Sequence, residues 1–185
     1  NTYWAIAIIA VVGLATAFYF REDMMRTSID APLSVIPISH ASLILNWGDD
    51  AIYIDPVGGA SAYEGERDPN IILVTDIHGD HLSTSTINSF TGNYGLVVPQ
   101  AVAELLSGPS ASVAQVVNNG QTVGVEEYLI TAIPMYNMPE SSASPHTKGR
   151  GNGYLIERDG FRVYIAGDTS ATPEMKSMGD IDIAF

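Results

Sequence analysis

The most constraining feature of this sequence is a series of short apolar segments separated by turn residues, beginning near residue 33. The segment 71–75 is apolar almost throughout, which is typical of a strand covered on both faces. Asp159-Gly160 is a two-residue hairpin turn within 153–168. Further strands are predicted at 34–39, 42–47, 51–55, 94–99, 111–117, 121–135 (two strands) and 182–185.

Short helices are predicted between the later strands. Ser83 is an N-cap candidate for a helix that runs to about residue 90, and Thr172-Pro173-Glu174 opens another. A third helix is predicted at 100–107, closed by Gly108-Pro109. Strands that are followed by strands interleaved with helices favour two packed sheets with helices on their outer faces.

Residues 3–20 carry no charge and form the longest apolar segment. A helix of this length would reach roughly 27 Å, close to the ~30 Å hydrocarbon core of a membrane. Residues 1–21 are therefore predicted to be a transmembrane anchor, and 22–32 a polar linker to an extracytoplasmic domain. A cleaved signal segment is the alternative, because Ala15-Thr16-Ala17 resembles a cleavage site. Either reading predicts a membrane-anchored or exported protein.

Charge and cysteine content exclude some partners and sites. The net charge of −13 argues against nucleic-acid binding, because no basic stripe is present. A small-molecule substrate, even an anionic one, stays compatible, since bound metal ions can invert the local field. The absence of cysteine rules out thiolate zinc sites and disulfides. Oligomeric state is not indicated by the sequence.

The segment after the strand at 71–75 is rich in metal-ligand side chains. Asp76 and His78 are two residues apart, so in extended backbone they point to the same side. Gly79 allows a sharp turn that would bring Asp80 and His81 round. Imidazole with carboxylate suits Zn, Mn or Fe. The alternative is a polar strand-to-helix connection in which Asp80 caps a helix and His81 is exposed.

The segment "TDIHGDHL" resembles the H-x-H-x-D-H signature of the metallo-β-lactamase superfamily, with Asp76 in place of the first histidine. Three further segments resemble the family's opening strands and its later ligand segments: "IPISHASLILNWGDDAIYIDPV", "HTKGRGNGYLI" and "VYIAGDTS". The resemblance is strongest to the branch containing ascorbate-phosphate lactonase and the N-acylphosphatidylethanolamine phospholipase. It implies a four-layer αββα sandwich of the α/β (α+β) class over residues 33–185, incomplete at the C-terminus.

The resemblance also implies a site with two divalent metal ions, Zn or Mn/Fe. Its predicted ligands are Asp76, His78 and His146 for the first ion, Asp80 and His81 for the second, and Asp168 as a bridge between them. The family's last ligand is a histidine further along, and His40 comes too early in the chain to be that ligand. Asp80 and Asp168 are the predicted catalytic residues.

The implied function is a metal-dependent hydrolase that directs a metal-bound hydroxide at a lactone, a phosphodiester or a related ester or amide bond. The alternative is a degenerate domain that acts as a non-catalytic binding module at a membrane. Asp76 is expected either to ligate, which would favour manganese or iron over zinc, or to turn away and bond the loop. Asn152 is a candidate substrate contact, with a plain turn role as the alternative.

Overall fold

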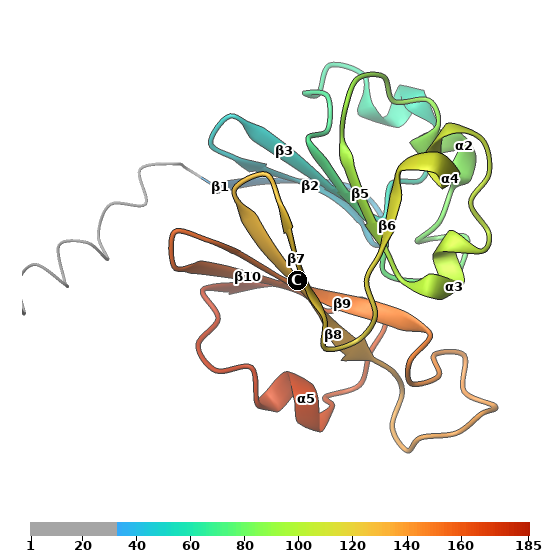
Figure 1. Cartoon of the computed structure of the whole chain (residues 1–185), viewed down its shortest axis with the longest axis vertical. Helices are drawn as coiled ribbons and strands as arrows, with labels where there is room; N and C mark the ends of the chain where they lie inside the picture. The colour runs from blue at the N-terminus through green and yellow to red at the C-terminus, as the bar shows by residue number, and fades with distance from the viewer. Residues whose placement is uncertain (1–32) are drawn as a thin grey trace, which may run out of the picture. The chain divides into compact units, whose positions relative to one another are not determined.

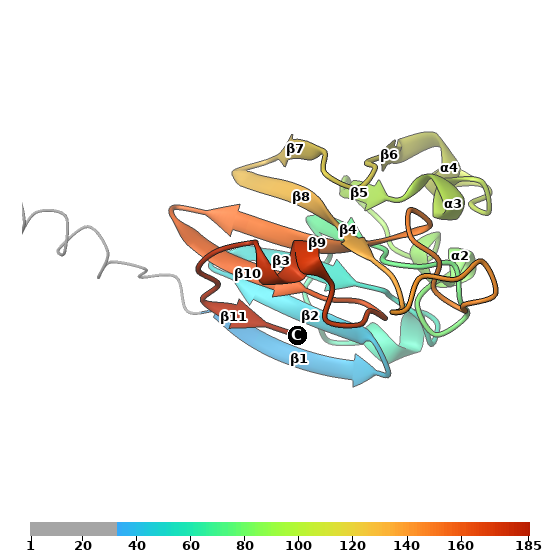
Figure 2. The ribbon, with the colours of Figure 1, turned by 90° about the horizontal axis from the view of Figure 1, so that it is seen from below.

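The computed structural model describes residues 33–185, so the predicted anchor or signal segment and the linker lie outside the described residues (Figure 1). Within 33–185, no helix is long and apolar enough to cross a membrane. Two sheets form the centre of this part of the chain. Figure 2 shows them stacked on each other, which is the arrangement that the strand-rich sequence predicts.

The first sheet contains the six N-terminal strands in sequence order. They are β1 (Leu33–Ser39), β2 (Ser42–Trp47), β3 (Asp50–Ile54), β4 (Ile71–Leu73), β5 (Gly95–Val98) and β6 (Ala114–Val116). The pairs β1–β2 and β2–β3 are antiparallel, whereas β3 to β6 are parallel. Because β3 and β4 are parallel neighbours, the residues that follow them leave the sheet at the same edge.

The second sheet has the order β11-β10-β9-β8-β7. Its strands are β7 (Thr122–Val125), β8 (Tyr128–Met135), β9 (Gly151–Arg158), β10 (Phe161–Ile165) and β11 (Ile183–Ala184). All neighbours are antiparallel except β10 and β11. The two strands predicted within 121–135 and the hairpin that turns at Asp159-Gly160 are confirmed.

Helices cover the outer faces of the two sheets. The short helices are η1 (Ala60–Tyr63), α2 (Thr84–Ile87), α3 (Gln100–Ala103), α4 (Pro109–Val113) and α5 (Pro173–Lys176). Ile87 of α2 and Val102 of α3 pack with the buried side chains of the first sheet. Met175 of α5 packs against Leu155 and Tyr164 of the second sheet. The order helix, sheet, sheet, helix confirms the predicted αββα sandwich.

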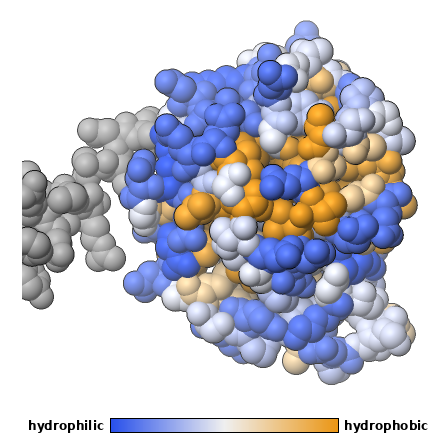
Figure 3. All heavy atoms as spheres, viewed as in Figure 1, coloured by the Kyte–Doolittle hydropathy of each residue, from blue (hydrophilic) through white to orange (hydrophobic). Residues whose placement is uncertain are grey.

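Apolar residues are concentrated between the layers, and some remain visible at the surface. On the face shown in Figure 3, they gather in a band across the middle, with polar residues above and below it. Inside, the Tyr154 hydroxyl of β9 donates to the Val74 carbonyl oxygen over 2.8 Å. That bond joins the second sheet to the chain segment that continues β4.

One predicted strand is partly wrong. Residues 111–117 were expected to be extended, but α4 occupies Pro109–Val113 and β6 only Ala114–Val116. Gly108 has a φ of 69°, and Pro109 stands at the start of the helix, where its fixed φ and missing N–H are favourable. The helices predicted at 83–90 and 100–107 are present but shorter. The Ser83 and Thr172 caps are confirmed, since each side chain accepts a backbone N–H three residues on.

Gly151 allows β9 to start against the end of β4. A Cβ at this position would lie 2.8 Å from the Thr75 carbonyl oxygen. The next residue, Asn152, donates its backbone N–H to that same oxygen over 2.9 Å. This close approach brings the residue before β9, Arg150, beside the residue after Thr75, Asp76.

Gly151→Ala is expected to lower the free energy of unfolding by about 1–3 kcal/mol, because backbone must shift to admit the methyl group. The measurement is urea denaturation of the full chain. Gly124→Ala is the matched control, since a Cβ there meets nothing within 4 Å. Equal midpoints for the two variants would contradict a constraint at Gly151.

Candidate metal centre

Four loops meet at one edge of the sandwich, and three of them bring together all six residues that the sequence predicts as metal ligands. They follow β3, β4 and β10 or connect β8 to β9. The predicted residues are Asp76, His78, Asp80, His81, His146 and Asp168. Their close polar atoms are joined by distances of 3.0–3.9 Å.

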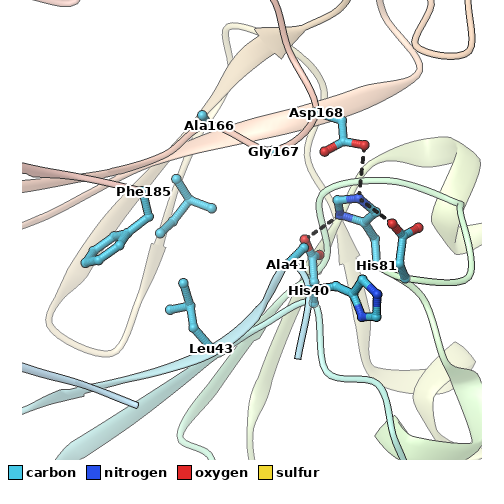
Figure 4. A pocket seen from close by; sticks show the side chains of 11 residues that line it. His40, Ala41, Leu43, His81, Ala166, Gly167, Asp168 and Phe185 are labelled. Carbon is cyan, nitrogen blue, oxygen red and sulfur yellow. Dashed lines mark hydrogen bonds and ion pairs between the residues drawn. The ribbon is translucent and has the colours of Figure 1, made fainter. Parts of the chain in front are cut away.

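His81 is the centre of one half of this cluster. Its Nε2 lies 3.4 Å from Asp168 Oδ2 and 3.9 Å from Asp80 Oδ2. Figure 4 shows the imidazole of His81 facing Asp168. Ligand bonds of ~2.0–2.2 Å in a tetrahedral site place neighbouring ligand atoms roughly 3.3 Å apart. The distance from His81 to Asp168 is close to this spacing, whereas the distance from His81 to Asp80 is longer.

Asp55 fixes the orientation of His81. Its carboxylate accepts the backbone N–H and the hydroxyl of Thr75, both over 2.6 Å, and its Oδ2 lies 2.8 Å from His81 Nδ1. Both Asp55 and His81 are buried. With Nδ1 bonded to a carboxylate, the imidazole presents Nε2 to the cluster, as metal-ligating histidines do.

The proton affinity of this pair is altered by its surroundings. Burial lowers the pKa of His81, but the hydrogen bond to Asp55 and the negative charge of Asp55 outweigh burial and raise the pKa to about 9. Burial also raises the pKa of Asp55. The shift of the His81 pKa favours a proton on this imidazole at neutral pH.

Asp55 is not among the site residues that the sequence predicts. The available signal was an aspartate directly after a strand, in "YIDPV". Its backbone has a φ of 46°, which a residue other than glycine adopts only at a cost. The hydrogen bonds to Thr75 and His81 offset that cost.

His146 forms the other half of the cluster with Asp168. Its Nδ1 lies 3.0 Å from Asn137 Oδ1, which orients the ring in the loop between β8 and β9. Its Nε2 is buried without a hydrogen-bond partner, 3.1 Å from Asp168 Oδ2. With the proton on Nδ1, a lone pair faces a carboxylate, and a bound cation would relieve that repulsion. This orphaned nitrogen fits the metal site that the sequence predicts.

Asp76, His78 and His146 form the most compact group of ligand atoms, all within 4.8 Å of one another. Asp76 is fully buried and also accepts two hydrogen bonds from Arg150. The Asp76 carboxylate therefore stays among the predicted ligands, which agrees with a role as a metal ligand. It also accepts hydrogen bonds from a residue of the β8–β9 loop, which agrees with the alternative role. Arg150 lies in "HTKGRGNGYLI", and no local pattern in that segment indicates that it pairs with Asp76.

A cleft of about 460 Å³ opens beside His81. Asp55, Asp80 and Asp168 line it together with His81, and His40 stands at its side (Figure 4). The volume is within the range of small-molecule sites. His40 is exposed, hydrogen-bonds Ser39 and shares this cleft with three of the predicted ligands.

The expectation that Asn152 contacts substrate is wrong. Asn152 is 1% exposed. Its amide nitrogen donates to the Val117 carbonyl oxygen, and its side-chain oxygen accepts from Asn119. Because both ends of the amide are used inside the protein, Asn152 supports the fold behind the site.

Comparison with known families agrees with this geometry. A family model described as the beta-lactamase superfamily domain matches residues 35–185. The chain belongs to this superfamily. The metallo-β-lactamase resemblance is therefore confirmed, whereas the lactonase and phospholipase branch stays a prediction.

Several members of the superfamily are similar over most of this chain. A metal-dependent hydrolase of Thermococcus kodakarensis is 28% identical over 156 residues, covering 80% of this chain and 68% of that protein. One from Pyrococcus furiosus is 30% identical, with coverages of 80% and 68%. The crystal structure of a putative metal-dependent hydrolase from Parabacteroides distasonis has 35% identity and a TM-score of 0.73, with coverages of 83% and 68%.

A metallo hydrolase from Ignicoccus hospitalis shares the fold, with a TM-score of 0.62, 19% identity, and coverages of 80% and 65%. This chain spans about two thirds of the length of the curated relatives it matches.

Proposed function

We propose that this protein is a metal-dependent hydrolase that acts on a small molecule with a lactone, phosphodiester or related ester or amide bond. The observation that carries this proposal is the position of Asp168, whose Oδ2 lies between the Nε2 atoms of His81 and His146. The orphaned Nε2 of His146 supports it further. Longer relatives that match most of this chain are named metal-dependent hydrolases.

Divalent metal ions bound here would supply a water of lowered pKa and stabilise negative charge that develops on a substrate oxygen. The residues around them have distinct tasks. His81, held by Asp55, and His146, held by Asn137, would present fixed nitrogen ligands. Asp168 would supply a carboxylate ligand close to both histidines. The side chain of Asp80 is half exposed and lines the cleft, so it would accept a hydrogen bond from the attacking water and orient it.

The test is a metal analysis of the full chain, followed by a screen of lactones and phosphodiesters with Zn, Mn and Fe in turn. We expect turnover that a chelator removes and added metal restores. Asp80→Asn is expected to lower it by about 10²-fold or more, as general-base and positioning groups do. Asp159→Asn is the matched control, because Asp159 is exposed in the β9–β10 turn.

Two results would contradict the proposed function. One is a full chain that binds no divalent metal under conditions in which it is folded. The other is turnover that Asp80→Asn and Asp159→Asn change equally.

A further inference from the structure

The cluster at Asp76 already contains a cation, the guanidinium of Arg150. Its Nε donates to Asp76 Oδ1 over 3.0 Å, and its Nη2 donates to Asp76 Oδ2 over 2.7 Å. The pair is bidentate, which is the most specific and among the strongest geometries between arginine and a carboxylate. Because Asp76 is fully buried, losing this partner would leave an uncompensated buried charge.

His78 lies against the same guanidinium. Its Nε2 is 3.4 Å from Arg150 Nη2, and its Nδ1 is 3.0 Å from Asp76 Oδ2. The guanidinium therefore contacts both of the ligands that the sequence motif offers to a first metal ion. A divalent ion at this place would compete for the same carboxylate and be repelled by the positive charge of Arg150. A cation from the chain itself thus accounts for the close approach of Asp76 and His78.

The other half of the site differs in charge. Among residues 33–185, no lysine or arginine forms an ion pair with Asp80 or Asp168; their close partners are the imidazoles of His81 and His146. Asp80, His81 and Asp168 also line the cleft, whereas Asp76 and His78 are not among its lining residues. The carboxylates that pair with imidazoles and with no lysine or arginine of the described residues are therefore the ones that open to the cleft.

We infer that Arg150 replaces one of two metal ions: its guanidinium is the resident cation at Asp76 and His78, and the chain binds a single divalent ion at Asp168, with His81, His146 and Asp80 around it. This inference rests on the proposed function, since it concerns the same site. It makes Arg150 a fixed positive charge that cannot be removed by a chelator. Arginine stays protonated in proteins, so it supplies charge and hydrogen bonds but does not exchange with solvent ions.

The test is the metal content of the full chain after saturation with Zn or Mn and removal of the unbound ions. We expect one equivalent per chain, and in the Mn-loaded protein the six-line electron paramagnetic resonance spectrum of an isolated ion. The double variant Asp76→His and Arg150→Met removes the resident cation and provides an imidazole. It is expected to bind two equivalents and to give the broadened spectrum of two coupled ions. Arg162→Met, which removes an arginine paired with Glu157, is the matched control and should stay at one equivalent.

The outcomes separate this inference from the proposed function. Two equivalents with a coupled spectrum in the wild-type chain would overturn the inference and leave the metal-dependent hydrolase intact. No bound metal in the folded wild-type chain would overturn both. A double variant that is folded by circular dichroism yet stays at one equivalent would also overturn the role of Arg150. If the double variant does not fold, the wild-type stoichiometry and spectrum decide alone.

Discussion

Asp168→Ala is expected to abolish detectable turnover and to lower bound metal to below one equivalent per chain. Asp168 Oδ2 approaches the Nε2 atoms of both His81 and His146, at 3.4 and 3.1 Å. Without this carboxylate, the cluster loses a charged ligand, and the imidazoles of His81 and His146 lose the group that both of them approach. We expect a fall in turnover of about 10³-fold or more, because the electrostatic stabilisation that the site provides is lost with the ion.

Metal content and turnover should be measured on the same preparation of the full chain. Asp159→Ala is the control for loss of an aspartate. The Asp159 side chain is 86% exposed, and it pairs with Arg158, which is not a site residue. A folded Asp168→Ala variant that keeps the wild-type metal content would show that Asp168 does not hold the ion.

Asp55→Asn is expected to weaken metal binding by about 10–100-fold, the usual effect of removing a group that orients a ligand histidine. The replacement has nearly the same shape, and asparagine tolerates the left-handed backbone at this position. Its amide can still accept the Thr75 N–H, but it then turns an NH₂ group toward His81 Nδ1. The proton of the imidazole would move to Nε2 and block the atom that faces Asp80 and Asp168.

The pH dependence of metal affinity gives a second readout for Asp55. In the wild-type chain, the pKa of His81 is raised to about 9, so the ion must displace a proton at neutral pH. Affinity should therefore rise as pH increases from about 6.5, the unperturbed pKa of histidine, to about 9. Without the negative charge of Asp55, the pKa of His81 falls and this rise should flatten. Asp159→Asn should keep the wild-type profile, and an unchanged profile in Asp55→Asn would refute the proposed link between Asp55 and His81.

The sequence by itself determined the strands, the turns and the ligand-bearing segment. Short apolar runs, the Asp159-Gly160 turn and the Ser83 and Thr172 caps are local signals, because each depends on residues within a few positions of one another. The four potential ligands within 76–81 are close together in the sequence, so the sequence alone indicated a metal site there. The helix at Pro109–Val113 was not predicted, because residues 111–117 were expected to form a strand.

Only the tertiary structure decided which charges meet. Arg150 is 74 residues from Asp76, and Asp55 is 26 residues from His81, so no local pattern pairs them. Both pairs depend on strand packing: β3 and β4 leave the first sheet at one edge, and β9 starts against Thr75 because Gly151 lacks a side chain. A buried carboxylate pairs with groups that lie about 3 Å from it. Spacing along the chain does not determine such distances, because they arise only when the two sheets have packed.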